Sequence, residues 1–349
     1  MSGKNAARRT EAEVTFDGVD ITKSIKPYLL SITYTDNEEG ETDDLQIQIQ
    51  DREGEWLQSW LEQVIEAASG AGLKFSAAFT QKNWGNDSTL PTGDFELDSV
   101  TAAGPPPTVT IKGTSLSFSA PIRQTKKSKA WESYNLSGIA SEIAGANGLS
   151  CMFESANDPF YERVEQRKTS DSAFLSKLCK DAGISLKATD GQIVLFDQSQ
   201  YEAQSPVLTI RRGKEGKYIQ YSLSTESADQ QYGSCRVSYT DPGSGKCIEG
   251  AYSDDSEKTG QCLEISAKVA DAREAKALAE KRLRLHNKLT RMVRFTFPGN
   301  PARVASVTVQ LEGWGGWDGK YIVKQAVHAA GSSGGYTTQI KARRCLEGY

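Results

Sequence analysis

Apolar and polar residues alternate along several short stretches of the chain, a pattern typical of strands with one buried face. The clearest stretch is LQIQIQ at 45–50, which places its leucine and isoleucines on one face and Gln46, Gln48 and Gln50 on the other. An apolar arm at 29–34 precedes it, so the two segments predict a hairpin. Further strands are predicted at 73–80, 93–100 and 107–113.

The tip of that hairpin, DNEEGETDD at 36–44, holds six carboxylates. Because like charges repel one another, we expect an extended loop in solvent. A metal site is the alternative, although the spacing does not fit an EF-hand.

Beyond residue 114 the pattern changes to the period of a helix. The segment YNLSGIASEIAGANG offers Asn135 as an N-cap, an apolar stripe, and Gly148 as a stop. A second helix is predicted from near Ser170 to Gly183. Its expected core-facing residues are Phe174, Leu175, Leu178 and Cys179.

A short hairpin is expected next, at 184–196, where Asp190 and Gly191 suit a tight turn. Two short helices and small strands together predict a middle α+β domain.

From about residue 200 the chain is again mainly β, and one longer helix interrupts the strands. Asp271 and Glu274 have the spacing of a capping box at its start. The core face of this helix is predicted to carry Ala275, Leu278, Ala279 and Leu285. Strands are predicted at 217–223, 233–240, 246–252, 261–267, 294–297, 306–313, 319–328 and 336–344.

The two β regions repeat one order of elements: a strand, a Trp-Gly turn, a Gly-aromatic strand and a closing strand. The first copy contains 73–80, Trp84, Gly85, Gly93 and Ile111, and the second contains 306–311, Trp314, Gly315, Gly319 and Ile340. We interpret this as an internal duplication, with a chance match of similar meanders as the alternative. Three copies of such a chain would present six similar surfaces, and a closed ring would cover edge strands.

Composition limits the classes of function. With 349 residues, a chain of this kind divides into roughly two or three domains. The net charge of −4 provides no overall basic field for nucleic acid or an anionic membrane. No apolar run approaches the roughly 18 residues of a spanning helix, and the start MSGKNAARRT lacks the apolar region of a secretory signal, so we expect a chain made in a cytosol without a membrane anchor.

The residues usual in catalysis and metal binding are scarce. The six cysteines show no CxxC spacing, and a disulfide between Cys235 and Cys247, which flank a turn, is disfavoured in a reducing compartment. Cys179 is expected to pack on the apolar face of its helix. His286 and His328, the two histidines, are expected at the surface or at a strand edge. No metal site and no cofactor is predicted.

Two further features have a functional and a structural interpretation. Glu96 and Asp98 would share one strand face as paired carboxylates, but alternation with Phe95 and Leu97 explains them as the polar side of a strand. The basic run RQTKKSK at 123–129 is expected to be a solvated linker, with phosphate binding as the alternative. Nucleotide-binding glycine motifs are absent from the sequence.

Several stretches in order resemble the phage late control protein D family, which is similar to the baseplate hub proteins of contractile tails and to the hub portion of type VI secretion spikes. The stretches are TGDFELDSV with VTIKGTS, RQTKKSKAWE, SDSAFLSKLCKDAGISLKATDGQIVLFD, and WDGKYIVKQAVH with GGYTTQIKARRCLEGY. The resemblance covers nearly the whole chain.

The resemblance implies a structural protein without catalysis, in which three chains form a ring that adapts a sixfold tail tube to a threefold spike. It implies tube-like β domains at 10–113 and 201–349, the second with a helix-containing insertion, around a middle α+β domain at 114–200. Implied partners are the tail tube protein, a separate spike protein, neighbouring baseplate proteins and the tape-measure protein, with DNA only as passing cargo. Gln46, Gln48 and Gln50 become candidates for the lumen wall, and the implied place is a virion baseplate assembled in the cytoplasm of a bacterial host.

Two alternatives come from other classes of protein. One is a tail-associated peptidoglycan hydrolase with Glu96 and Asp98 as acid and base. The other is a carbohydrate-binding β module with an aromatic platform of Trp314 and Trp317.

Overall fold

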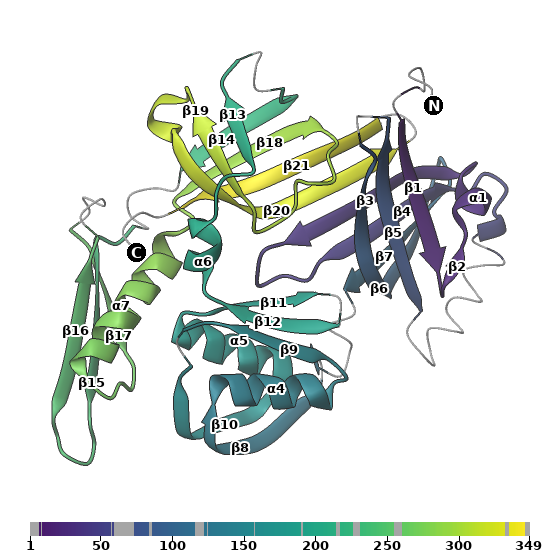
Figure 1. Ribbon diagram of the computed structural model, residues 1–349. Coiled ribbons are helices and arrows are strands. Elements are labelled where there is room, and N and C mark those ends of the chain that lie inside the picture. The colour runs from purple at the N-terminus through teal and green to yellow at the C-terminus, as the bar shows by residue number, and fades with distance from the viewer. Residues whose placement is uncertain are drawn as a thin grey trace.

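Strands from both β-rich ends of the chain form one continuous sheet of 13 strands (Figure 1). Smaller sheets with helices lie below it in the figure. The computed structural model describes residues 7, 9–56, 58, 73–83, 86–115, 122–123, 125–156, 158–189, 191–213, 217–225, 231–254, 260–331 and 335–345.

The first β unit comprises the strands up to residue 115. They are β1 (Arg9–Phe16), β2 (Val19–Asp20), β3 (Leu29–Asn37), β4 (Asp44–Gln50), β5 (Lys74–Lys82), β6 (Ser88–Ala103) and β7 (Thr108–Ser115), with the short helix α1 (Thr22–Ile25). They lie in the order β3-β4-β7-β6-β5-β1-β2, and every neighbouring pair is antiparallel. As the alternation predicts, Leu45, Ile47 and Ile49 are buried in the core of this unit.

The second β unit contains β13 (Leu208–Arg211), β14 (Gln220–Thr225), β18 (Arg291–Pro298), β19 (Thr308–Glu312), β20 (Gly319–Gly331) and β21 (Gly335–Arg344), with the 3-10 turn η5 (Gly315–Trp317). Its strands lie in the order β14-β18-β21-β20-β19-β13. All pairs are antiparallel except β13 with β19.

The two β units share one strand order, although β1 runs antiparallel to β5 whereas its counterpart β13 runs parallel to β19. Across the sheet, the six main strands lie in the order β1-β5-β6-β7-β4-β3 in the first unit and β13-β19-β20-β21-β18-β14 in the second. If the strands of each unit are numbered one to six along the chain, both orders read 1-4-5-6-3-2. The same irregularity also recurs, because the ladder shifts register between Leu97 and Ser99 in β6 and between Val323 and Gln325 in β20. The expected repeat is confirmed in strand order, although the first Trp-Gly pair lies outside the described residues.

One strand pair joins the two units. Residues Gln325–Gly331 of β20 pair with Asn37–Ser31 of β3, antiparallel. We call this pair of strands the internal junction.

The middle part of the chain combines helices with two small sheets. Its elements are β8 (Lys126–Asn135), α4 (Leu136–Ala146), β9 (Ser150–Glu154), β10 (Phe160–Ser170), α5 (Asp171–Ala182), β11 (Ser185–Thr189), β12 (Gln192–Phe196) and α6 (Gln198–Ala203). Both predicted helices are confirmed. The Ser170 hydroxyl accepts a hydrogen bond from the Ala173 amide at 3.4 Å, and Gly183 ends α5 with φ of +70°. Asn135 holds the N-cap position of α4, but its side chain makes no capping hydrogen bond.

The prediction that residues 123–129 form a solvated linker is wrong. Most of it belongs to β8, which pairs with β10. Lys127 forms an ion pair with Asp171 at 2.6 Å, and the Lys129 ammonium lies 3.6 Å from the centre of the Trp131 ring. This part of β8 is exposed on both faces, so its lysines reach solvent while the strand pairs with β10.

A third small sheet carries the long helix of the second half. It consists of β15 (Ser234–Thr240), β16 (Cys247–Ser253) and β17 (Cys262–Ser266), and α7 (Ala272–Asn287) packs against it. Asp271 accepts a hydrogen bond from the Glu274 amide at 2.8 Å, as the capping spacing predicts. The face of α7 differs slightly from the prediction, because Leu283 is buried and Leu285 is only half-buried.

The strand register shows that Cys235 and Cys247 do not form a disulfide. Cys235 lies opposite Tyr252 and Cys247 lies opposite Thr240, so the two do not face each other across the hairpin, and both are free thiols. The two cysteines are five residues out of register, because Tyr252, which faces Cys235, lies five residues after Cys247.

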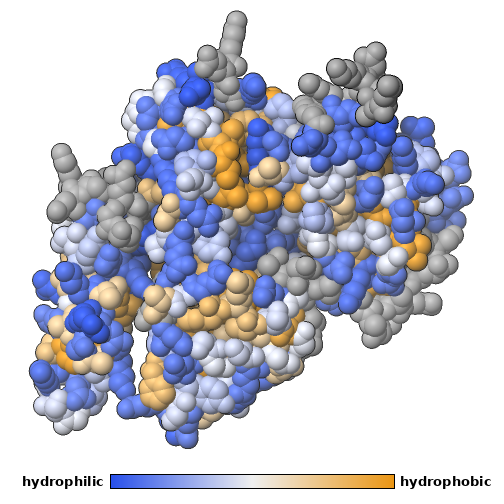
Figure 2. Space-filling view, in the orientation of Figure 1, coloured by the Kyte–Doolittle hydropathy of each residue, from blue (hydrophilic) through white to orange (hydrophobic). Residues whose placement is uncertain are grey.

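Strands dominate the described residues, so the expected mainly β class with a smaller α+β part holds. Four separate apolar cores accompany the first β unit, the second β unit, the middle part and the α7 sheet. On the face seen in Figure 2, hydrophilic atoms cover most of the surface, with hydrophobic atoms gathered in a few places.

Candidate functional site

The face of the large sheet opposite the core is polar. Gln46, Gln48 and Gln50 lie on this face of β4, half-buried, while the alternate residues of the strand point into the core. Their ladder neighbours on β7 are Lys112, Thr110 and Thr108. Amides and hydroxyls of this kind bind water and offer no nucleophile or acid-base pair.

The acidic segment at the tip of the β3-β4 hairpin is buried, so the expected solvated loop is wrong. Asp36, Glu38 and Asp43 are between 0% and 6% exposed. Each of these three side chains forms an ion pair with a cation from a distant part of the chain. We call these groups, together with the charged residues that contact them, the ionic junction. Its members are Asp36, Glu38, Glu39, Asp43, Lys187, Glu202, Arg284, Lys288 and Arg343.

Arg343 of β21 lies at the centre of the ionic junction. Its guanidinium donates to Glu38 at 3.0 Å, to Glu202 at 2.7 Å and to the Gln198 side chain at 3.1 Å. Arg284 of α7 contacts the other oxygen of Glu202 at 2.6 Å. The fork of the guanidinium thus fixes β21, the β3-β4 hairpin and α6 relative to one another.

Two lysines pair with Asp36, Asp43 and Glu39, whereas Glu41 of the same segment is exposed. The Lys187 ammonium on β11 lies 2.8 Å from Asp36, and Lys288, just after α7, pairs with Glu39. Asp36 also accepts a hydrogen bond from the Ala305 amide at 2.7 Å. The ionic junction therefore connects both β units, the middle part and α7.

Burial and neighbouring charges act in opposite directions on the pKa values of the ionic junction. Burial prevails at Glu38, whose pKa is raised despite Arg343. Burial would lower the pKa of Arg343, but Glu38 and Glu202 outweigh it and raise that pKa. Burial would likewise lower the pKa of Lys187, but Asp36 and Asp43 raise it. Removing one partner from such a group leaves a buried charge uncompensated, which typically costs about 3–5 kcal/mol.

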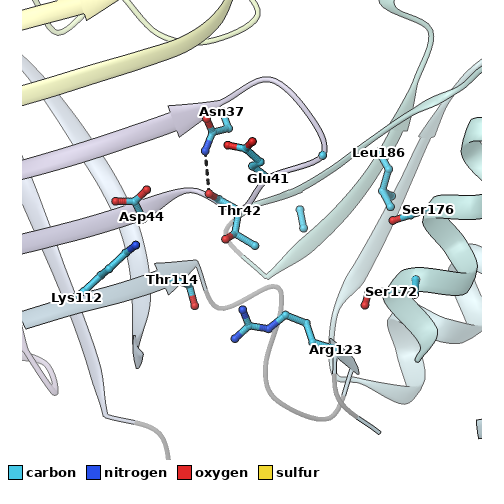
Figure 3. A pocket seen from close by; sticks show the side chains of 13 residues that line it. Asn37, Glu41, Thr42, Asp44, Lys112, Thr114, Arg123, Ser172, Ser176 and Leu186 are labelled. Atoms are coloured by element: carbon cyan, nitrogen blue, oxygen red, sulfur yellow. Dashed lines mark hydrogen bonds between the residues drawn. The ribbon is translucent and has the colours of Figure 1, made fainter. Parts of the chain in front are cut away.

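A polar cavity of about 510 Å³ lies between the β3-β4 hairpin and α5 (Figure 3). Its wall carries both charge signs, with Glu41 and Asp44 on one side, and Lys112 and Arg123 below them in the figure. Burial raises the pKa of Asp44 against the opposing effect of Lys112. The cavity lies between two parts of the chain, and the described residues that line it include no histidine or cysteine.

The predicted carboxylate pair does not form a regular pair. Glu96 lies half-buried opposite Thr114 of β7, whereas Asp98 is the extra, exposed residue of the β-bulge in β6. The bulge interrupts the alternation that would place both carboxylates on one face. The hydrolase interpretation therefore loses the arrangement on which it depended.

Trp314 is a core residue, which agrees with core packing and removes the alternative of an aromatic platform. It is 7% exposed, donates its indole N–H to the Ile210 carbonyl at 2.9 Å and packs edge-on against Phe295. Trp317 packs against the same core, and its carbonyl accepts a hydrogen bond from the Tyr321 hydroxyl at 3.0 Å.

The histidines have different surroundings. His286 is exposed on α7, as expected. His328 is fully buried, which corrects the expected edge position, and burial lowers its pKa to about 4. Its Nε2 donates to the Arg303 carbonyl at 2.9 Å, so Nδ1 accepts from the Tyr336 hydroxyl at 2.7 Å.

Cys179 is buried in the core of the middle part, and burial raises the pKa of its thiol to about 12, which agrees with packing rather than reactivity. No group of three or more histidine, cysteine or carboxylate side chains suited to a metal occurs in the described ranges. None of the helices in the described part of the chain is long and apolar enough to span a bilayer.

No family model matches the chain, but two curated proteins do. The probable baseplate hub protein of Escherichia phage 186 is 24% identical over 220 residues, covering 62% of this chain and 53% of that protein. The probable baseplate hub protein of Escherichia phage P2 is 26% identical over 217 residues, covering 61% and 52%. The chain resembles phage baseplate hub proteins. It spans about half the length of these curated relatives.

Solved tail proteins share the fold over almost the whole chain. The 43 kDa tail protein of prophage MuSo2 from Shewanella oneidensis has a TM-score of 0.68 at 14% identity, covering 96% of this chain and 98% of its own. A tail protein from Neisseria meningitidis MC58 has a TM-score of 0.69 at 11% identity, covering 96% and 97%. A type VI secretion component from Escherichia coli has a TM-score of 0.55 at 11% identity, covering 92% and 75%. The resemblance to phage tail and type VI hub proteins drawn from the sequence is thereby confirmed.

Proposed function

We propose that the chain is the baseplate hub of a phage tail or of a related injection particle. Three copies form a ring in which six β units meet a sixfold tail tube on one side and a threefold spike on the other. The observation that carries this proposal is the common strand order of the two β units, with the register shift at the same place in each. The names of the curated relatives support the place of the protein in the particle.

The mechanism is geometric. Two β units of one strand order let a chain occupy two neighbouring positions of a pseudo-sixfold ring, while the middle part and the α7 sheet occur once per chain. The ring therefore has threefold symmetry overall and near-sixfold symmetry where the β units lie. The ionic junction fixes the angle between the two units.

The polar face of the sheet lines the lumen. Gln46, Gln48 and Gln50 of each chain contribute amides, which do not bind the phosphates of passing DNA by charge, and Lys112 beside Gln46 adds one cation to the same face. The apolar alternate residues face the cores away from the channel.

The partners follow from this arrangement. Divided at 10–113, 114–200 and 201–349, each chain offers its β domains to the tail tube protein and to a separate spike protein. The parts that occur once per chain contact neighbouring baseplate proteins, and the tape-measure protein and DNA pass through the lumen. The hub has no catalytic role, and it assembles in the cytoplasm of the bacterial host.

Deletion of the coding sequence in a bacterium that produces the particle tests this function. Electron microscopy is expected to show no complete tails, with tails restored by a plasmid copy of the chain. Complete, spike-bearing tails in the deletion strain would contradict the proposal.

A further inference from the structure

In the part of the chain that the structure describes, several edges of the large sheet lack a neighbouring strand, and two of them correspond to strands that are paired elsewhere in the chain. β14 pairs only with β18, and residues 99–103 of β6 pair only with β7. By the common strand order, β14 corresponds to β3 and β6 corresponds to β20. Those two counterparts are the strands that pair with each other in the internal junction.

Corresponding residues on β3 and β14 differ sharply in exposure. The ladders show which residues correspond. In the first unit Ile32 lies opposite Ile47, and Ile47 lies opposite Ile111 of β7. In the second unit Tyr221 lies opposite Phe295, and Phe295 lies opposite Ile340 of β21. Ile32 and Tyr221 thus occupy the same place in the two units, yet Ile32 is 0% exposed and Tyr221 is 46% exposed.

The exposed apolar surface extends along the same edge. Ile219, two residues before Tyr221, is 62% exposed, and Leu223, two residues after it, is partly buried in the second core. We call Ile219, Tyr221 and Leu223 the edge patch. Exposed apolar side chains beside an open strand edge are typical of an interface.

The equivalent surface of the first β unit is covered by the β20-β21 hairpin. Ala330 and Tyr336 near the tip of this hairpin pack on the first core, and the Tyr336 ring stacks on Phe79 with 5.5 Å between centroids. The corresponding hairpin of the first unit is β6-β7, whose tip, Gly104–Pro107, is exposed. Its three prolines offer apolar rings and, since they lack N–H groups, end the strand ladder.

We propose that the β6-β7 hairpin of one chain covers the open edge of β14 in the next chain, with its proline tip on the edge patch. This inference rests on the proposed ring and names the surfaces that close it. The occupant is a second copy of this chain, because the same chain already contains this contact once, between β20 and β3.

The internal junction also fixes the register between chains. Within the chain, Val327 lies opposite Thr35 and Ala329 lies opposite Thr33. We apply the same register to the corresponding strands, with β6 in the place of β20 and β14 in the place of β3. Thr101 of one chain then lies opposite Ser224 of the next chain, and Ala103 lies opposite Ser222. Directly opposed residues in an antiparallel pair have Cα atoms about 4.5–5.5 Å apart, within the range of a disulfide.

Cysteine cross-linking tests the register. In the full chain carrying Thr101→Cys and Ser224→Cys, mild oxidation is expected to give covalent two-chain and three-chain species that disappear on reduction. The matched control, Thr101→Cys with Gln220→Cys, shifts one partner by four residues and is expected to give neither. Equal cross-linking by both pairs, or by neither while the chain remains trimeric, would overturn the inference and leave the ring itself standing.

Substitution of the tip provides an independent measurement. Pro105→Ser with Pro106→Ser is expected to raise the concentration at which the trimer dissociates by tenfold or more, without changing the circular dichroism of the chain. Pro242→Ser, in an exposed turn of the α7 sheet, is the control and is expected to leave dissociation unchanged. A trimer as stable as wild type after the tip substitution would contradict the docking of the tip, whereas a wild-type chain that never forms trimers would contradict the proposed function.

Discussion

Arg343 and Glu38 form a fully buried ion pair although 305 residues separate them in the chain. The pair joins the last strand of the second β unit to the acidic end of β3 in the first. Because the two groups come from different β units, their contact helps to fix the relation between the units, beside the strand pair of the internal junction.

Replacement of Arg343 is expected to destabilise the protein strongly. Arg343→Met removes the cation and leaves Glu38 and Glu202 buried near each other, so we expect a loss of about 3–5 kcal/mol in the free energy of unfolding. Urea denaturation measures this value. Arg211→Met is the control, because Arg211 is 58% exposed and its surface ion pair contributes at most about 1 kcal/mol. A loss below about 1 kcal/mol for Arg343→Met would contradict the role of the ionic junction.

The buried His328 is expected to make the stability of the fold depend on pH. Its pKa is about 4 in the folded chain and about 6.5 in the unfolded chain, so the unfolded state gains the proton first as the pH falls. The stability is fully present above pH 6.5 and decreases, by about 3 kcal/mol in total, as the pH falls to about 4.

Urea denaturation between pH 7.5 and pH 4.5 checks this dependence. His328→Gln is expected to flatten the part of the slope that lies between pH 6.5 and pH 4. His286→Gln, on the exposed histidine of α7, is expected to keep the wild-type slope. An unchanged slope in His328→Gln would show that other groups cause the pH dependence.

The local pattern of the sequence was sufficient for most elements. The periodicity with the stop at Gly183 predicted α5, and the capping spacing at Asp271 predicted α7. The alternation at 45–50 predicted β4 together with its buried face. These features depend on neighbours within a few residues, which a sequence pattern contains.

The buried acidic segment could not be predicted in the same way. Glu38 and Asp36 are balanced by Arg343 and Lys187, which lie 305 and 151 residues away in the chain. The sequence of a run of carboxylates is the same whether the side chains lie in water or pair with cations from distant parts of the chain. The bulge at Asp98 was also unforeseen, since one extra residue in a strand leaves the alternation of its neighbours almost unchanged.

The glutamines of β4 are expected to keep the lumen from retaining DNA. Gln48→Lys with Gln50→Lys would add six ammonium groups to the channel of a trimer, so we expect salt-dependent binding of short duplex DNA that is stronger than that of wild type. Ala251→Lys with Ser253→Lys, on the exposed face of β16, adds the same charge outside the channel and is the control. Filter binding at two salt concentrations compares the three proteins. DNA binding equal in both variants would contradict the assignment of this face to the lumen.

The central claim is that one chain supplies two equivalent β units to a ring of three. The mass of the purified chain in solution, followed by an electron microscopy reconstruction of the particles, tests it most directly. The account predicts a mass of three chains and a ring with six similar β lobes and three peripheral domains around a central channel. A strict monomer at high concentration, or a ring in which the two β units of a chain occupy unrelated positions, would contradict it.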